Sequence, residues 1–589
     1  MHVIATAGHV DHGKSTLVRT LTGADPDRLS EEHRRGLSIE LGYCWTHLAG
    51  VGEVAFVDVP GHERFISTML AGVGPVPAVL FVVAADDPWM PQAAEHLAAL
   101  DALGVEHGVV AITRSDLADP ATTTQRALAR LRGTSLHHAP AIAVSARTGA
   151  GIEGLRRALV ELVRDLDVPD PTADVRLWVD RCFHVVGAGT VVTGTLTAGT
   201  IRVGDTLSLG SATVRVRGIQ TLERPVTDAS GVARVALSLG GNTPAGLERG
   251  CVLVTPDAWL FASTLDVRTS SAAALPERPM LHVGATSASC RCRPLSEDLL
   301  RLTLDRPLPL RVGDRVLLRN PGDRKVWGAT VLDPRPPALN RRGSARDRAE
   351  ALAASDGRPD ARAELRRRGP VSRTLLRQIG ADTGSVDGLA VQAGDWLLDA
   401  ELAAGLGRRL RTIVEDHDAA DAVNPGVPVA AAAHALGLPT PELVAALVAP
   451  PLWLSNGRVR AGHAAGLPPQ LDDALARLGH DLANDPFAAP TAGRLTELGL
   501  DAKAIGAAIK AGRLLRISGT LVLLPGADAE AARRLSRLPQ PFTTSRARMA
   551  LATSRRVALP LLAHLDRLGW TRRLPDDRRT ASLPPAHGA

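Results

Sequence analysis

A short stretch near the N-terminus has the residue types and spacing of a phosphate-binding loop. Gly8, Gly13, Lys14 and Ser15 fit the pattern G-x-x-x-x-G-K-[ST], between an apolar segment and a helix-like one. The glycines let backbone N–H groups point at phosphate, and the positive end of the following helix adds to the attraction. Lys14 is expected to contact the β- and γ-phosphates, and Ser15 to ligate Mg²⁺. The predicted phosphate-binding residues are Gly8, Asp11, His12, Gly13, Lys14, Ser15, Thr16 and Gly61.

Lysine is scarce in this chain, which uses arginine almost everywhere else. The lysines that remain are Lys14, Lys325, Lys503 and Lys510. Because a compact ammonium and a planar guanidinium do not bind phosphate in the same way, the persistence of Lys14 supports its predicted role.

A second group of residues follows the apolar segment at 53–58. Asp58 stands where a carboxylate reaches Mg²⁺ through water, and the N–H of Gly61 can meet the γ-phosphate. His62 then stands where an attacking water molecule must be held. The pattern D-x-P-G-H after a phosphate-binding loop resembles the translational GTPases, so the resemblance predicts an enzyme that hydrolyses GTP when the ribosome moves this histidine inward.

The segment at 35–39, R-G-L-S-I, resembles the first switch of that family, R-G-I-T-I. Ser38 keeps the hydroxyl that ligates Mg²⁺ but lacks the methyl group of threonine, which should loosen the packing of the closed switch. The resemblance implies that Val10 and Leu37 form an apolar gate that restrains the histidine.

Guanine recognition normally uses N-K-x-D, and this chain has T-R-S-D at 113–116. Asp116 can still accept hydrogen bonds from N1 and N2 of guanine, which adenine lacks, so guanine should be preferred. The contact of the usual asparagine is lost. Arg114 can cover the base in place of the lysine, and the resemblance assigns a backbone contact with the guanine oxygen to a second loop. The predicted guanine-binding residues are Thr113, Arg114, Asp116, Ser145, Ala146 and Arg147.

These residues need a parallel sheet to position them, and the sequence predicts one. Strand-like and helix-like segments alternate to about residue 168, after which short β-branched runs between glycine turns indicate barrels. Beyond a proline- and arginine-rich hinge, short helices alternate with two-stranded ribbons, as in winged-helix modules. The predicted fold is multidomain: an α/β P-loop GTPase domain (1–168), two β-barrel domains (172–258 and 261–338) and tandem α+β winged-helix modules (345–420, 421–468, 469–526 and 527–589).

Length and composition agree with several packed domains. A chain of 589 residues exceeds the size of one hydrophobic core, and 45% hydrophobic with 22% charged residues is typical of globular proteins. The sequence predicts a cytosolic monomer without a membrane segment, because no long uncharged apolar run occurs. The net charge of +6 is weakly indicative of a nucleic-acid partner. Reduced structural thiols are expected at Cys44, Cys182, Cys251, Cys290 and Cys292.

Two segments resemble the selenocysteine-specific elongation factors of bacteria, the SelB type. They are A-D-D-P-W-M-P-Q-A-A-E-H-L, with Pro88 where glycine is usual, and D-R-C-F-H-V-V-G-A-G-T-V-V-T-G-T from Asp180. The resemblance implies that Asp180, Arg181 and Arg234 line a pocket for the charged tRNA. A selenol is more acidic than a thiol, so the cargo would carry a selenolate that cations select over neutral serine.

The tail resembles the winged-helix repeats of the same family, most clearly in the last module. The residues predicted to bind RNA are Ser554, Arg555, Arg556, Arg572 and Arg573, because guanidinium groups hold phosphates at a helix start and on a wing. Arg578 and Arg579 lie on the same predicted wing. We expect Pro560 to kink the helix or delay its start, a fragment from Ala527 to fold alone, and the run 366–368 to be solvated.

The resemblance as a whole implies a factor that uses GTP and Mg²⁺ to deliver selenocysteinyl-tRNA to the ribosome at recoded UGA codons. Its tail would bind an mRNA selenocysteine-insertion hairpin. Two alternatives stay open at this point: a regulatory RNA-binding GTPase without a tRNA cargo, and a general elongation or initiation factor with a divergent tail. The presence of selenocysteine synthase and its tRNA in the same genome would discriminate among them.

Overall fold

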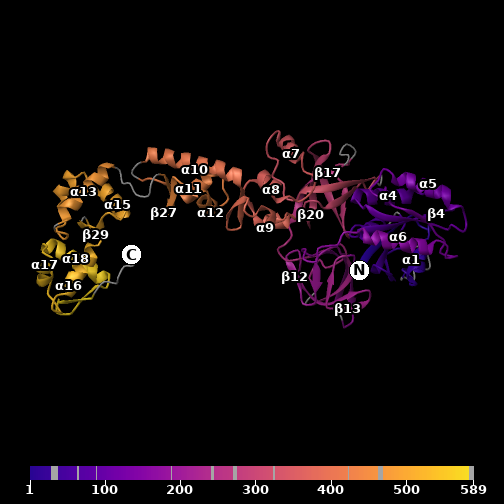
Figure 1. The fold of residues 1–589 in the computed structure, drawn as a ribbon, viewed down its shortest axis with the longest axis horizontal. Coiled ribbons are helices and arrows are strands. Elements are labelled where there is room, and N and C mark those ends of the chain that lie inside the picture. The colour runs from indigo at the N-terminus through magenta and orange to yellow at the C-terminus, as the bar shows by residue number, and fades with distance from the viewer. Residues whose placement is uncertain are drawn as a thin grey trace. The chain divides into compact units, whose positions relative to one another are not determined.

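The computed structural model describes most of the chain and divides it into two compact units, Met1–Leu402 and Ala403–Ala589 (Figure 1). None of its described helices is long and apolar enough to cross a membrane. The described residues are 1–27, 38–62, 65–87, 89–187, 189–240, 244–269, 275–322, 325–421, 424–461, 469–483, 485–519 and 521–582.

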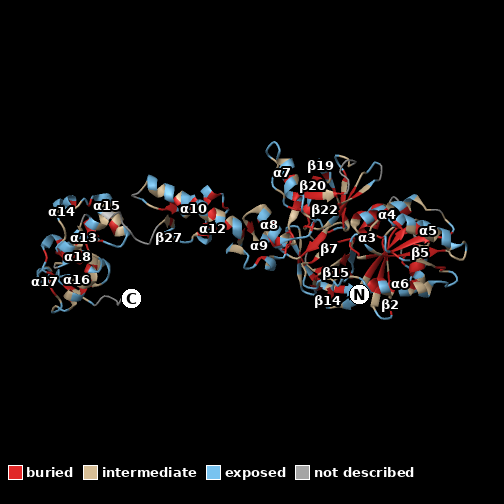
Figure 2. Cartoon of the chain, turned by 45° about the horizontal axis from the view of Figure 1, so that its top comes forward, coloured by how far each residue is buried: buried red, intermediate tan, exposed pale blue. Residues whose placement is uncertain are grey.

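The first domain is a six-stranded sheet with helices on both faces. Its strands are β1 (His2–Gly8), β2 (Gly42–Leu48), β3 (Gly52–Asp58), β4 (Ala78–Ala84), β5 (His107–Thr113) and β6 (Ala141–Ala143), in the order β2-β3-β1-β4-β5-β6. All neighbouring strands run parallel except β2 and β3. The strands are largely buried (Figure 2). This is the predicted α/β domain.

Alternating side chains of β1 divide the core between the two faces of the sheet. Ile4 packs with α1 (Lys14–Thr22) and α6 (Ile152–Arg164), whereas Val3 and Ala5 pack toward the other helices. The helices on that second face are α3 (Ile66–Val73), α4 (Pro91–Leu103) and α5 (Pro120–Leu131). Because parallel strands end at one edge, the loops after β1, β3 and β5 meet there.

Two barrels follow, as the sequence predicts. In the first, the strands run in the order β11-β16-β7-β9-β15-β12, and pairing of β11 with β12 closes the ring. In the second, β17-β20-β19-β18-β21-β22 form a closed six-stranded barrel. The strands are β7 (Arg176–Trp178), β8 (Arg181–Val185), β9 (Gly189–Leu196), β10 (Thr200–Arg202), β11 (Thr206–Leu209), β12 (Ala212–Thr221), β13 (Arg224–Val226), β14 (Asp228–Ser230), β15 (Ala233–Gly240), β16 (Val252–Val254), β17 (Phe261–Thr269), β18 (Met280–Val283), β19 (Thr286–Pro294), β20 (Leu299–Pro309), β21 (Arg315–Arg319) and β22 (Val326–Asp333).

The first tail module belongs to the same compact unit as the barrels. It consists of α7 (Ser344–Leu352), α8 (Ala361–Arg368), β23 (Val371–Ser372), α9 (Arg373–Gln378), the 3₁₀ turn η2 (Thr383–Val386), β24 (Ala390–Ala393) and β25 (Trp396–Asp399). The three strands form one small sheet in the order β23-β25-β24. Helices followed by such a sheet are the elements of a winged helix.

A buried ion network joins this module to the second barrel and corrects one prediction. Arg367 and Arg368 are not solvated: each side chain is only 13% exposed, and both pair with fully buried Asp333, at 2.6 and 2.5 Å. Burial by itself raises the pKa of Asp333, but the arginines around it lower that pKa to about 2. Only Arg366 of the basic run is exposed. Glu364, three and four residues earlier, also pairs with these arginines, but the sequence could not indicate the burial against Asp333, which lies more than thirty residues away on β22.

The second unit contains the remaining winged-helix elements. They are α10 (Ala400–Ala420, whose first residues belong to the first unit), β26 (Val427–Pro428), α11 (Val429–Leu436), α12 (Pro441–Leu447), β27 (Leu452–Ser455), β28 (Arg458–Ala461), α13 (Pro469–Ala483), α14 (Ala492–Glu497), α15 (Ala502–Lys510), β29 (Leu515–Ser518), β30 (Leu521–Leu523), α16 (Ala527–Ser536), α17 (Thr544–Ala550), α18 (Arg555–Arg567), β31 (Thr571–Arg573) and β32 (Arg579–Ala581). The backbone N–H of Gly426 donates to Asp418 of α10 at 2.5 Å, so this helix contacts the module that follows it. The boundary between units falls inside α10, whereas the sequence analysis placed a module boundary after residue 420.

The last module shares its core with the preceding one. Phe487, Ile517 and Leu523 pack in one cluster with Leu561 and Leu565 of α18. A fragment beginning at Ala527 would lose these partners, so we expect it to be less stable than the two modules together. Helix α18 begins at Arg555, five residues before the proline inside it, so of the two expected effects of Pro560, a kink or a late start, the late start does not occur.

Candidate nucleotide-binding site

The loop between β1 and α1 has the geometry of a phosphate-binding loop. Gly8 has a φ of 131°, and a Cβ there would lie 2.2 Å from the Val82 carbonyl oxygen, so only glycine fits. Gly13, with a φ of 85°, caps the N-terminus of α1. Buried Lys14 donates through Nζ to the carbonyl oxygens of Gly8 at 3.2 Å and His9 at 2.7 Å. Burial lowers the pKa of Lys14 to about 8, although Asp58 opposes this effect.

Oxygen atoms from three predicted metal ligands converge beside Lys14. The Ser15 hydroxyl donates to the fully buried Asp58 carboxylate at 2.6 Å and lies 3.1 Å from the Ser38 hydroxyl. The Ser38 hydroxyl donates to Asp27 at 2.7 Å. Burial raises the pKa of Asp58, and the Lys14 ammonium opposes this rise. Two hydroxyls and a carboxylate fit a hard cation such as Mg²⁺. Asp27 was not predicted as part of this site, because it lies in none of the sequence motifs.

The base-reading loops hold Asp116 in a defined orientation. One carboxylate oxygen accepts from the Ser145 hydroxyl at 2.6 Å, and the other accepts from Nε of Arg147 at 2.8 Å. These hydrogen bonds, Ser145 first, lower the pKa of Asp116, so it remains a carboxylate. Each carboxylate oxygen has a second lone pair, which leaves two acceptor positions for the N1 and N2 donors of guanine.

Thr113 stands where the motif normally has asparagine, and its side chain fixes the position of the loop. Its buried hydroxyl donates to the His12 carbonyl oxygen at 2.7 Å and so ties the base-reading loop to the phosphate-binding loop. Arg114, with a φ of 54°, adds a second tie: its guanidinium donates to the Asp11 carbonyl oxygen and pairs with Asp86 at 3.2 Å. The loop is therefore fixed without an asparagine side chain.

These loops surround one cavity of 660 Å³, which has the size of a nucleotide site. It is lined by Val10, Asp11, Gly13, Lys14, Ser15, Thr16, Asp27, Ser38, Gly61, Thr113, Arg114, Asp116, Leu117, Ala146 and Arg147. The lining includes most of the predicted phosphate, metal and guanine residues, whereas Gly8, His12, Asp58 and Ser145 do not line the cavity. Of the predicted gate, Val10 lies here, whereas Leu37 and the switch residues 35–36 lie outside the described residues, as does Pro88.

His62 stands at the edge of this site. Gly61 lines the cavity, and a Cβ on it would lie 2.5 Å from Nζ of Lys14. The ring of His62, half-buried, packs 6.0 Å from the ring of Phe65, measured between centroids. The histidine is therefore next to the residue that faces the phosphates, and it does not line the cavity itself.

Replacing Asp116 by asparagine should weaken GTP binding by about 1–3 kcal/mol, because a charge-assisted acceptor is lost. Equilibrium titration with a fluorescent GTP analogue measures the effect. Xanthosine triphosphate, whose base presents an acceptor where guanine has the 2-amino donor, should lose less affinity than GTP. If GTP affinity stays the same in the variant, the 113–116 loop does not read the base.

The predicted cargo residues form a buried pair and a separate arginine. Arg234 (β15) and Asp180 are 9% and 3% exposed, and Nη2 of Arg234 donates to the Asp180 carboxylate at 2.7 Å. Burial disfavours the charged guanidinium, yet Asp180 raises the pKa of Arg234 above its ordinary value. Arg181 points elsewhere: it pairs with Glu40 at 3.2 Å and donates to the Leu41 carbonyl oxygen. In this arrangement both cations already have acidic partners.

The predicted RNA-binding residues of α18 lie at its exposed N-terminus. Ser554 is the N-cap residue, without a capping hydrogen bond from its side chain. Arg555 is exposed and has no ion-pair partner among the residues that the structure describes. Arg556 contacts the carbonyl oxygens of Ala489 and Pro490 at 3.4 and 3.5 Å.

The arginines of the wing differ in their partners. Arg573 pairs with Asp577, and Arg578 pairs with Asp576 at 2.6 Å. Arg579 is 8% exposed and pairs with Asp566 at 3.1 Å. Arg572 is exposed, and within the described chain no acidic side chain pairs with it. Because several of these arginines pair with carboxylates, the module exposes fewer unpaired positive charges than its number of arginines suggests.

The fold and the site define a GTP-binding domain of the translation-factor class. Residues 1–165 match the family model of the elongation factor Tu GTP binding domain. Residues 263–338 match that of the selenocysteine-specific elongation factor β-barrel domain, and residues 533–580 match that of the elongation factor SelB winged helix. The selenocysteine-specific elongation factor of Escherichia coli K12 is 34% identical over 445 residues, which cover 71% of this chain and 70% of that protein. The chain belongs to the selenocysteine-specific elongation factor family, the SelB family.

Other comparisons agree with this placement. The selenocysteine-specific elongation factor of Desulfomicrobium baculatum is 35% identical over 385 residues, or 62% of this chain and 61% of that protein, so the match spans less than two thirds of this relative. A crystal structure of a bacterial selenocysteine-specific elongation factor shares the fold over 99% of this chain and 100% of that one, with a TM-score of 0.77 at 24% identity. A Methanococcus maripaludis SelB structure with the GTP analogue GppNHp covers 57% of this chain and 79% of that one, with a TM-score of 0.50 at 24% identity.

Proposed function

We propose that this chain delivers selenocysteinyl-tRNA to the ribosome at recoded UGA codons and hydrolyses GTP there. A nucleotide site, two barrels and a SelB-type winged helix on one chain carry this proposal. The delivery step is tested by protection of the charged tRNA ester, which requires the barrels and GTP together.

Mg²⁺ would be held by Ser15, Ser38 and Asp58, because the Ser15 hydroxyl already lies within hydrogen-bonding distance of both the Ser38 hydroxyl and the Asp58 carboxylate. When bound, the cation would supply positive charge to neutralise the charge that develops during phosphoryl transfer. Lys14 places a second positive charge at the phosphates, and the backbone N–H groups of the loop add dipoles there. Gly61 leaves room for the γ-phosphate beside Lys14 because it has no side chain.

His62 would orient the attacking water once the ribosome moves its ring toward the cavity. It follows Gly61 directly, so a small backbone rotation carries its ring toward the γ-phosphate. Val10 lines the cavity and would form one side of the apolar gate that restrains the histidine before that movement. Leu37 would form the other side.

Arg181 and Arg234 would select a selenolate cargo by charge. Arg234 is buried and already bonded to Asp180, so the anion would meet a guanidinium that is partly neutralised. Arg181 is one-third exposed and contacts residues 40–41, which follow the first switch. The GTP-dependent state of that switch would therefore decide whether Arg181 is available to the cargo.

The tail would bind an mRNA hairpin through Arg555, Arg556 and Arg572. Replacing Arg572 by alanine should weaken hairpin binding and reduce the log-log salt slope by about one unit. Arg578→Ala is the matched control, because Arg578 is already paired with Asp576 and should change both quantities less. Titration of the full chain at several salt concentrations compares the hairpin, a scrambled loop and plain duplex RNA. Equal binding to all three RNAs would show that these arginines form a general basic surface without preference for the hairpin.

A further inference from the structure

Two histidines of the phosphate-binding loop and one aspartate form a cluster outside the nucleotide cavity. His9 and His12 lie between β1 and α1, and Asp87 follows β4. Their potential ligand atoms all lie within 4.8 Å of one another. The two imidazole rings are 4.9 Å apart at their centroids and inclined by 72°. None of the three residues lines the cavity around Lys14 and Asp116, so the cluster is distinct from the Mg²⁺ ligands.

The cluster contains two imidazoles and one carboxylate, and the Lys14 ammonium lies close enough to act on both histidines. The His12 side chain is fully buried, and its Nε2 faces the Asp87 carboxylate at 3.3 Å. Burial, assisted by His9, lowers the pKa of His12 to about 4, although Asp87 opposes this, so the imidazole is neutral near pH 7. No hydrogen bond of good geometry joins the ring nitrogens of His12, or Nδ1 of His9, to another described residue, although the Val82 backbone lies near His12 and the Gln92 side chain near His9. Buried polar atoms of this kind normally have a partner.

The geometry suits a transition metal. Zinc binds imidazole nitrogen and carboxylate oxygen at about 2.0–2.1 Å, and a tetrahedral site then separates neighbouring ligand atoms by about 3.3 Å. The distance between Nε2 of His12 and the Asp87 oxygen has this value. Two neutral imidazoles and one carboxylate are ligands for Zn²⁺ or Co²⁺, whereas Mg²⁺ prefers oxygen ligands alone.

We propose that His9, His12 and Asp87 bind one divalent transition-metal ion of the zinc class, with a fourth position open to water. The ion ties the phosphate-binding loop to the connection between β4 and α4. The same loop already contacts this region, because the Gly8 N–H donates to Nδ1 of His96 on α4 at 3.1 Å. The His9 carbonyl oxygen also accepts from Lys14 at 2.7 Å. The metal therefore stiffens the loop that holds Lys14, and it slows release of a bound nucleotide.

Cobalt(II) titration of the full chain tests this site. The protein is first saturated with GDP and excess Mg²⁺, so that the oxygen-ligand site is filled. The expected result is visible d–d absorption that saturates at one equivalent of Co²⁺ and is removed by Zn²⁺. Asp87→Asn and His12→Gln should each weaken Co²⁺ binding by more than about 100-fold, beyond the cost of losing an outer-shell partner.

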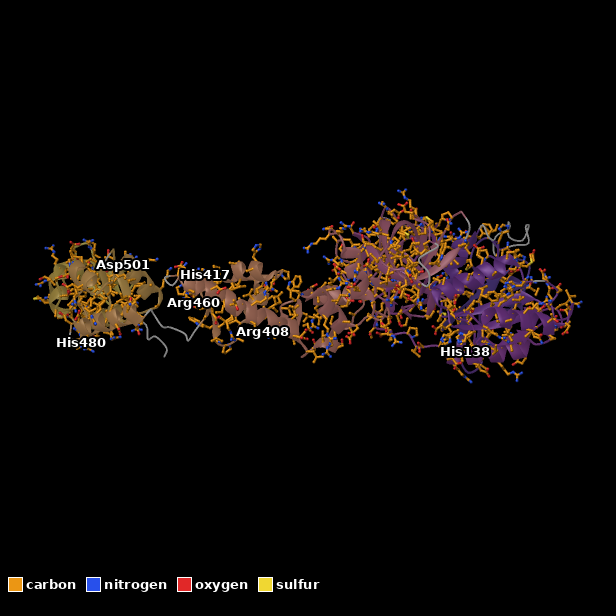
Figure 3. All side chains as sticks on the ribbon, turned by 90° about the horizontal axis from the view of Figure 1, so that it is seen from above. His138, Arg408, His417, Arg460, His480 and Asp501 are labelled. Carbon is orange, nitrogen blue, oxygen red and sulfur yellow. The ribbon has the colours of Figure 1, made fainter. Side chains whose placement is uncertain are left out.

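Asp87→Asn is the more informative variant because Asp87 is 34% exposed and its replacement leaves the fold intact. Retained affinity for a fluorescent GDP analogue checks this. His138→Gln is the matched control: His138, labelled in Figure 3, lies beside His137 with ring centroids 3.9 Å apart, and this pair could itself attract Co²⁺. The control should bind Co²⁺ like the unaltered chain. The proposal is overturned if Asp87→Asn keeps the signal, if His138→Gln loses it, or if the spectrum shows thiolate ligation.

Discussion

Replacing His62 by alanine should lower ribosome-stimulated GTP hydrolysis by about 10²- to 10⁴-fold, the usual contribution of a positioned proton-transfer group. GTP affinity should stay nearly unchanged, because Gly61, and not His62, lines the nucleotide cavity. Single-turnover hydrolysis with and without ribosomes measures the first quantity, and titration with a fluorescent GTP analogue measures the second. The loss should appear in kcat and kcat/KM alike, as expected for a residue that acts only in the transition state.

His47→Ala is the matched control for this variant. His47 lies on β2 of the same domain, is 67% exposed and is 3.6 Å from Glu53, so its loss should change neither hydrolysis nor binding. Unchanged stimulated turnover in His62→Ala would refute the assignment of His62. A parallel loss of GTP affinity would show instead that the substitution disturbs Gly61 and the phosphate-binding loop.

Removing Arg234 should destabilise the first barrel by about 3–5 kcal/mol, because it leaves the buried Asp180 charge without a cationic partner. Hydrogen exchange of the paired strands β9 and β15 reports this as a lower free energy of local opening. Arg181→Ala is the contrasting variant. Its side chain is 32% exposed, so the stability should change by about 1 kcal/mol or less.

A double variant separates the structural role of Arg234 from cargo selection. Replacing Asp180 by leucine together with Arg234 by methionine removes both charges, and most of the stability should return. Discrimination between selenocysteinyl- and seryl-tRNA should stay reduced in this variant, since the Arg234 guanidinium is gone and only Arg181 remains at the pocket. If the double variant stays as unstable as Arg234→Ala alone, the buried pair is not the source of the loss. If discrimination returns with stability, Arg234 does not read the cargo.

The motifs of the nucleotide site could be located from the sequence because they are contiguous and sit at strand ends. Asp27 was missed because it reaches Ser38 through a loop, and no spacing indicates that contact. The hydrogen bond from Thr113 to the His12 carbonyl oxygen depends on how two loops meet in the fold. From the sequence alone, the departure from N-K-x-D therefore indicated only the loss of the asparagine contact.

The tail was less predictable because its contacts are distant in the sequence. A basic run suggests solvent exposure, yet Arg367 and Arg368 find Asp333 across a module boundary. The core of the last module likewise includes Phe487, far from the segment that the sequence pattern delimits. The alternation of short helices with two-stranded ribbons indicated winged-helix modules but could not show which modules share a core.

Protection of the charged tRNA ester is the most direct test of the proposed delivery function. The rate of ester hydrolysis is measured for selenocysteinyl-tRNA and seryl-tRNA, with and without the full chain and GTP. We predict that the factor with GTP slows hydrolysis of the selenocysteinyl ester strongly and of the seryl ester little, and that GDP abolishes the effect. Equal protection of both esters, or protection that does not depend on GTP, would contradict the account.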